Sequence, residues 1–173
     1  MKAFSLIALL ALILFFDSCD PFESVKKEEL PPATQEGKNT FGCLVNGRVW
    51  LPRGNNGKTN LDASYDPSYQ NGSLDVGAYR IYDSVDQFIA IGGKNINTVG
   101  EYLFSSQSDA GALLNDKKTN CSYNDPDNII SGNLNITRLD VNGRIISGTF
   151  EFSLAKSDCD TVKVTEGRFD MKF

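Results

Sequence analysis

The alternation of apolar and polar side chains in the last third of the chain constrains its fold more than any other feature. Every second position is apolar from 150 to 154, and again from 169 to 173. In the second run Asp170 falls between two apolar residues and so belongs to the polar face. A period of two places successive side chains on opposite faces of a strand that is buried on one side. We therefore expect long antiparallel strands in this region.

Turn signals divide the preceding chain into short runs of strand type. Asn46-Gly47 and Asn142-Gly143 each lie between two apolar runs, which is the strongest short-range signal for a hairpin. The segment 105–116 lacks a clear period, and we expect a loop or one short helical turn near residues 110–114. The strands expected between these turn signals are 41–45, 48–51, 61–65, 73–80, 87–91, 98–104, 129–140, 144–154 and 162–173.

Short strands at intervals of about ten residues, with turn signals between them, are typical of a sandwich or a barrel. No stretch shows a helical period of useful length. Trp50 follows the first hairpin directly and is expected in the core. We predict an all-β domain, either an antiparallel β-sandwich or a flattened β-barrel, that ends in a three-stranded meander over residues 129–173.

The N-terminus has the pattern of a secretory signal. Residues 3–16 are apolar except for one serine, follow Lys2 and end shortly before Cys19. Fourteen residues are too few for a membrane-spanning helix, which needs about 20. Ser18 followed by Cys19 looks like the lipobox of a bacterial lipoprotein, which is cut before the cysteine that is then lipidated. The alternative is an ordinary signal whose Cys19 later enters a disulfide.

Residues 20–39 show neither a strand nor a helix period and are rich in charged residues, proline and small polar residues. Such a composition suits a disordered segment. We therefore divide the chain into a lipoprotein signal peptide (1–18), a flexible tether (19–39) and a single all-β domain (40–173). The tether would hold the domain clear of the lipid headgroups.

The charge and the residue usage exclude several classes of function. The net charge is −5 and no basic run or stripe exists, which argues against nucleic acid as a partner. The chain contains no histidine, which removes Ser-His-Asp and Cys-His catalysis and zinc held by histidine. We assign no catalytic residue, metal ligand or cofactor, and we expect membrane contact through the lipid on Cys19 alone.

If Cys19 is lipidated, three cysteines remain in the domain. In an antiparallel meander the start of 129–140 and the loop after residue 154 lie at the same end, so Cys121 and Cys159 lie near each other. Cys43 shares an apolar strand face, where a thiol behaves as a small apolar side chain. We predict a Cys121–Cys159 disulfide, and the alternative is that both are free.

Four tyrosines, Tyr65, Tyr69, Tyr79 and Tyr82, lie in or beside polar segments rich in turns. Exposed tyrosine rings are common in sugar and peptide binding sites, so these residues are candidate ligand contacts. Tyrosine is also an ordinary strand residue, which is the competing explanation. Acidic residues are too numerous for the sequence to single out a carboxylate pair.

Five stretches of the chain carry a resemblance to a known family: Thr40–Trp50, Gly100–Tyr102, Ile136–Asp140, Ile146–Phe152 and Val164–Asp170. Together they resemble a group of Bacteroidota lipoproteins of unknown function. The resemblance implies an N-terminal lipobox, an all-β domain and a location in the outer membrane, and it implies no activity. Secreted proteins of this phylum carry O-glycans at Asp-(Ser/Thr)-apolar, and Ser84 and Thr161 stand in such triplets.

Taken together, the sequence predicts a lipoprotein anchored in the outer membrane that acts as a non-enzymatic binding or envelope-structural module. An envelope protein or a glycan would be its ligand. The alternative is a hydrolase that uses carboxylates on envelope or extracellular polymers, since a fold by itself does not exclude an enzyme.

Overall fold

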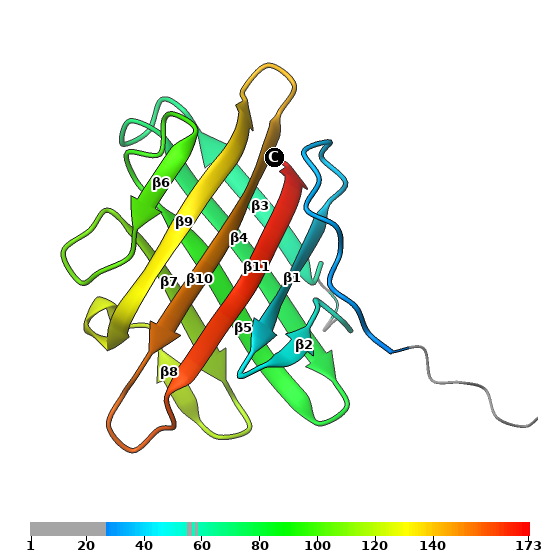
Figure 1. Cartoon of the computed structure of the whole chain (residues 1–173), viewed down its shortest axis with the longest axis vertical. Helices are drawn as coiled ribbons and strands as arrows, with labels where there is room; N and C mark the ends of the chain where they lie inside the picture. The colour runs from blue at the N-terminus through cyan, green and yellow to red at the C-terminus, as the bar shows by residue number, and fades with distance from the viewer. Residues whose placement is uncertain (1–26, 55–56, 58) are drawn as a thin grey trace, which may run out of the picture.

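The protein is an all-β sandwich of two antiparallel sheets. The structure, a computed structural model, describes residues 27–54, 57 and 59–173. Figure 1 shows the two sheets in two layers, with their strands crossing in this view. Sheet A has six strands in the order β2-β1-β11-β10-β9-β6, and sheet B has five in the order β3-β4-β5-β7-β8. The two sheets are separate and do not close into a barrel, so of the two predicted architectures the sandwich is confirmed.

The bounds of most strands lie close to those predicted from the sequence. Sheet A consists of β1 (Thr40–Val45), β2 (Arg48–Trp50), β6 (Gly100–Leu103), β9 (Ile129–Asp140), β10 (Ile145–Leu154) and β11 (Val162–Lys172). Sheet B consists of β3 (Leu61–Asp66), β4 (Ser73–Tyr82), β5 (Val85–Gly93), β7 (Ala110–Asp116) and β8 (Cys121–Tyr123). The 3-10 turn η1 (Pro126–Asn128) lies between β8 and β9. The predicted C-terminal meander is present as β9-β10-β11.

One element differs from the prediction. Residues 110–116, expected as a loop or a helical turn, form strand β7, which pairs with β5 along its whole length. Ala110 and Leu114 are buried on one face of this strand, so the period of two is present. It is hidden in the sequence because residues 110–112 are all small and the next two are both leucine, so apolar and polar side chains do not alternate. Pairing with β5 supplies the stability that local preference does not.

The core lies between the inner faces of the two sheets. Val76, Ile89 and Leu114 point into it from sheet B, and Leu134 and Ile146 from sheet A, each at most 1% exposed. Trp50 and Cys43 belong to the same cluster, as expected from their apolar strand positions. Burial raises the pKa of the Cys43 thiol to about 12, so this cysteine stays protonated and packs as an apolar side chain.

Cys121 and Cys159 form a disulfide, the pairing expected from the meander, with Cα atoms 5.9 Å apart. The bridge joins the start of β8 in sheet B to the loop between β10 and β11 in sheet A. It therefore connects the two layers close to the segment through which the chain passes from one sheet to the other. Closing a loop of this length stabilises the fold by about 4 kcal/mol in the chain-entropy model.

Residues 28–39 are bound to the domain, along sheet A from Pro31 onward, instead of forming part of a flexible tether. Figure 1 shows this segment beside β1 before it turns into that strand. We call residues 28–38 the strap. At one end, Glu28 pairs with Arg80 at 2.9 Å and with Arg53 at 3.0 Å. In the middle, a Cβ on Gly42 of β1 would lie only 2.7 Å from Pro31, so the absence of a side chain there makes room for the strap.

At its other end the strap is fastened to Asp170, which is only 1% exposed. The carboxylate of Asp170 accepts five hydrogen bonds, and four of the donors belong to the strap. The donors are Thr34 Oγ1 at 2.6 Å, the amides of Glu36, Gly37 and Lys38 at 3.0, 2.7 and 3.2 Å, and Ser147 Oγ at 2.7 Å. The turn needs glycine at position 37, where φ is +71°.

The tether prediction failed for the strap because its binding partners lie far away in the sequence. Asp170, for example, is more than 130 residues from Glu36. A segment without its own period shows no sign in its sequence that a distant carboxylate will order it. The preceding part of the predicted tether, the signal peptide and Cys19 lie outside the described residues.

Candidate binding groove

An open groove with a volume of 410 Å³ lies on the outer face of sheet B. Strands β4, β5 and β7 form its floor, and the chain around η1 forms one wall. The volume falls in the range of about 300 to 1,000 Å³ that is typical of ligand sites. The face is an outer one because Leu74 and Val76, which flank Asp75 on β4, are buried in the core while Asp75 is exposed.

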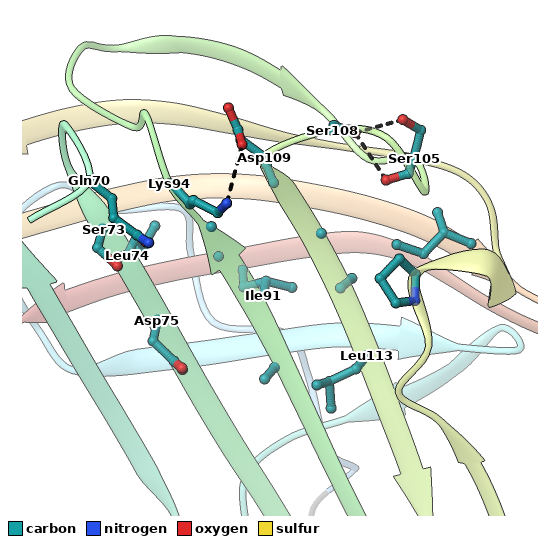
Figure 2. A pocket seen from close by; sticks show the side chains of 18 of the residues that line it. Gln70, Ser73, Leu74, Asp75, Ile91, Lys94, Ser105, Ser108, Asp109 and Leu113 are labelled. Atoms are coloured by element: carbon teal, nitrogen blue, oxygen red, sulfur yellow. Dashed lines mark hydrogen bonds and ion pairs between the residues drawn. The ribbon is translucent and has the colours of Figure 1, made fainter.

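The floor of the groove is hollow because glycines occupy it on two strands. Asp75 on β4 pairs with Gly92 on β5, and Gly92 pairs with Gly111 on β7. One row across three strands therefore contains a single side chain, that of Asp75, at one end. Figure 2 shows the neighbouring strands from the groove side, with Asp75 and Leu113 on different strands of the floor.

Apolar groups border this row on two sides. Ala90 and Leu113 occupy the next row of the sheet and are partly exposed. At the β7 side the wall contains Pro126 and Ile129. A Cβ placed on Gly111 would be 3.6 Å from Ile129 Cδ1 and would meet nothing else within 4 Å. The groove at Gly111 therefore has room for a side chain.

Polar groups close the groove at the end where β5 and β7 meet the loops. Lys94 Nζ lies 3.8 Å from the carboxylate of Asp109, and Asn95 donates a hydrogen bond to the same carboxylate. Ser105 and Ser108 bond to each other through their hydroxyls at 2.7 Å. Figure 2 draws the contact of Lys94 with Asp109 and that of Ser105 with Ser108. The polar groups at this end are thus already engaged with one another.

Asp75 differs from these groups because nothing is bonded to it. Among the described residues its carboxylate has no ion-pair partner and no hydrogen-bond donor. Desolvation by the surrounding protein raises the pKa of Asp75, and the nearby Asp62 carboxylate raises it further. Both effects show that the negative charge is poorly compensated in this structure.

The four tyrosines predicted as ligand contacts do not form one surface. Tyr65 packs on Phe173 and donates to the carbonyl of Ile96, while Tyr69 is 58% exposed in the turn after β3. Tyr79 stacks on Phe88 with ring centroids 4.3 Å apart on the outer face of sheet B. Tyr82 lies at the far end of β4, under the guanidinium of Arg53. None of the four lines the groove.

The sequence pattern does not single out the residues that shape the groove. Gly92-Gly93 follows the expected strand 87–91, and Gly111 lies in the segment without a clear period. Asp75 alternates with buried residues as any solvent-facing strand residue would. The signal that could have found the groove is a glycine or alanine at facing positions of adjacent strands, and this requires the strand register.

The remaining predicted sites are exposed or lie outside the described residues. Ser84 occupies the tip of the β4–β5 hairpin and Thr161 precedes β11, and both are exposed. Within the described part of the chain, no group of three or more Cys, Asp or Glu side chains is placed to hold a metal ion. The same residues include no helix that is long and apolar enough to cross a membrane. No family model, curated protein or solved structure matched the chain.

Proposed function

We propose that this protein is a lipid-anchored binding module of the bacterial outer membrane, and that the groove on sheet B is its binding site. It acts without catalysis, by holding a ligand on the outer face of β4, β5 and β7. The lipid on Cys19 supplies its attachment to the membrane.

The observation that carries this proposal is the separation of the strap from the groove. From Pro31 onward the strap lies along sheet A, and at its start Glu28 pairs with Arg80 near the end of β4, away from the groove. The groove opens on the outer face of sheet B. The eight residues 20–27 separate Cys19 from Glu28, where the strap begins. Fully extended, they span at most about 28 Å. A lipid at Cys19 would hold the strap side close to the membrane and leave the groove side unobstructed.

Labelling with palmitate tests the anchor. We expect the full chain to incorporate palmitate and to fractionate with membranes, and we expect Cys19→Ala to lose both. Ser18→Ala is the matched control, because alanine is also a small residue before the cut and should leave labelling intact. Palmitate incorporation by Cys19→Ala would contradict the proposed anchor.

A second candidate function is a hydrolase that uses carboxylates, and the raised pKa of Asp75 favours it. A carboxyl group that stays protonated at higher pH is suited to act as a general acid. The groove also contains Asp109, but Figure 2 shows Asp109 away from Asp75, with Lys94 between them and paired to Asp109. Turnover of envelope polymers by the purified chain, abolished in Asp75→Asn, would establish this candidate in place of simple binding.

A further inference from the structure

We propose that the groove binds the side chain of a lysine presented by an extended segment of a partner protein. The aliphatic stem of that lysine would lie over Gly92 and Gly111, and its ammonium group would pair with Asp75. This inference rests on the proposed function and names the chemistry of the ligand.

The shape of the floor supports a long, thin occupant. The row Asp75, Gly92 and Gly111 crosses three strands. Neighbouring strands lie about 4.8 Å apart, so the row is about 10 Å long. It is bordered by Ala90 and Leu113 along one side and by Ile129 beyond Gly111. An apolar trough with a carboxylate at one end is complementary to a side chain that has an apolar stem and a cationic tip.

The charges support a cation rather than an anion. Of the two acidic side chains that line the groove, Asp109 already has Lys94 as its partner, at 3.8 Å. Asp75 has no such partner within the described residues, and Asp62 and Asp66 of the adjacent strand β3 also make no ion pair there. The outer face of sheet B beside the groove is therefore negative and uncompensated. An ammonium group placed at Asp75 would supply the missing charge.

The lining also distinguishes a lysine from a sugar ring. Sites for sugars commonly present an aromatic ring on which the ring of the sugar stacks. No aromatic side chain is among the described residues that line the groove. Tyr79 and Phe88, the stacked pair on the same sheet, lie one row further along the strands, beyond Ala90 and Leu113. The floor is made of glycine and alanine, over which an alkyl chain can lie closely.

The test is a titration of the isotope-labelled full chain, purified in detergent, with short capped peptides, followed by the shifts of its amide signals. Three peptides differ only at the central residue, which is lysine, acetyl-lysine or glutamate, and an uncharged chitin oligosaccharide is the fourth probe. Acetyl-lysine keeps the stem and removes the charge. We expect the lysine peptide to shift the amides of Gly92, Gly111 and their neighbours, and to bind at least about fivefold more tightly than the other three probes.

Two variants and two matched controls locate the site. Asp75→Asn should weaken binding of the lysine peptide about fivefold, to the level of acetyl-lysine, whereas Glu151→Gln removes one charge from the outer face of sheet A and should change nothing. Gly111→Leu fills the trough and should weaken binding more than tenfold. Ser131→Leu places the same side chain on an exposed position of β9 in sheet A, outside the groove, and should bind normally.

The outcomes separate this inference from the function on which it rests. Equal weakening by Asp75→Asn and Glu151→Gln would mean non-specific attraction and would overturn the inference. Binding of the oligosaccharide that is lost in Gly111→Leu but not in Asp75→Asn would also overturn it, while leaving the groove as a binding site. A third outcome is that no probe shifts the amide signals of the natural chain, or that every such shift persists in Gly111→Leu. That outcome would overturn both the inference and the groove's part in the proposed function.

Discussion

Asp170 and Asp75 occupy comparable positions on the outer faces of the two sheets, yet their surroundings differ completely. Asp170 is covered by the strap and accepts five hydrogen bonds. Asp75 is uncovered and accepts none from the described side chains. Burial alone acts to raise the pKa of Asp170, but the hydrogen bonds from Thr34, Ser147 and the strap amides outweigh it and hold that pKa well below its usual range. The pKa of Asp75 is raised.

The difference agrees with the separate tasks that we propose for the two faces. On sheet A the negative charge is used internally, because it fastens the N-terminal segment to the domain. On sheet B a similar charge stands at the end of a trough and remains available to a molecule from outside. A group that is fully satisfied contributes stability, and a group that is left unsatisfied at the surface is free for binding.

The largest effect is expected from Asp170→Asn. The amide keeps the size of the side chain, but its NH₂ group faces donors in place of an acceptor, so several buried or partly buried donors lose their partner. We expect the free energy of unfolding to fall by about 3 kcal/mol and the amides of residues 36–38 to exchange rapidly. Denaturant unfolding and hydrogen exchange measure these effects. A loss as small as that of the control Glu151→Gln would show that the bonds of Asp170 to the strap do not contribute to stability.

The same carboxylate predicts a dependence on pH. Because the pKa of Asp170 is lower in the folded protein than its value of about 3.9 in an unfolded chain, its stabilisation is complete above that value. It is lost as the pH falls from about 4 through the lower folded pKa. The difference in unfolding free energy between the natural chain and Asp170→Asn should therefore be constant near neutral pH and shrink below pH 4. A difference that grew on acidification would contradict this assignment.

The two faces also differ in how much of their structure can be predicted from the sequence. The alternation around Phe169 and Met171 correctly placed Asp170 on the polar face of its strand, because the period of two depends only on neighbouring residues. Its burial under the strap depends on contacts with Thr34 and Gly37, more than 130 residues away, and no local pattern carries that information. The groove was missed for a related reason. Gly92 and Gly111 form a trough only because β5 and β7 pair in one particular register.

A smaller effect is expected at the other end of the strap, from Glu28→Gln. Burial acts to raise the pKa of Glu28, but the hydrogen bonds and charges of Arg80 and Arg53 lower it overall. The side chain of Arg80 is only 11% exposed, so losing its partner should cost about 1 to 2 kcal/mol. Glu36→Gln removes an exposed pair with Lys38 and should cost less than about 0.5 kcal/mol. Equal losses in the two variants would mean that Glu28 does not fasten the strap.

The smallest effect is expected from Asp75→Asn in the absence of ligand. No described group donates to this carboxylate, and its removal relieves repulsion from Asp62. The unfolding free energy should stay within about 0.5 kcal/mol of the natural chain, with any change in the stabilising direction. Thermal and denaturant unfolding measure this directly. A loss above about 1 kcal/mol would show that Asp75 has a structural partner after all.

The most direct test of the division of tasks is to measure lysine-peptide binding by Asp75→Asn and Asp170→Asn side by side, at a temperature where both are folded. We expect Asp75→Asn to keep its stability and to lose about fivefold in affinity, and Asp170→Asn to lose stability and to bind the peptide as the natural chain does. If Asp170→Asn weakens binding as much as Asp75→Asn, or if neither variant changes it, the two faces do not have the separate tasks assigned to them.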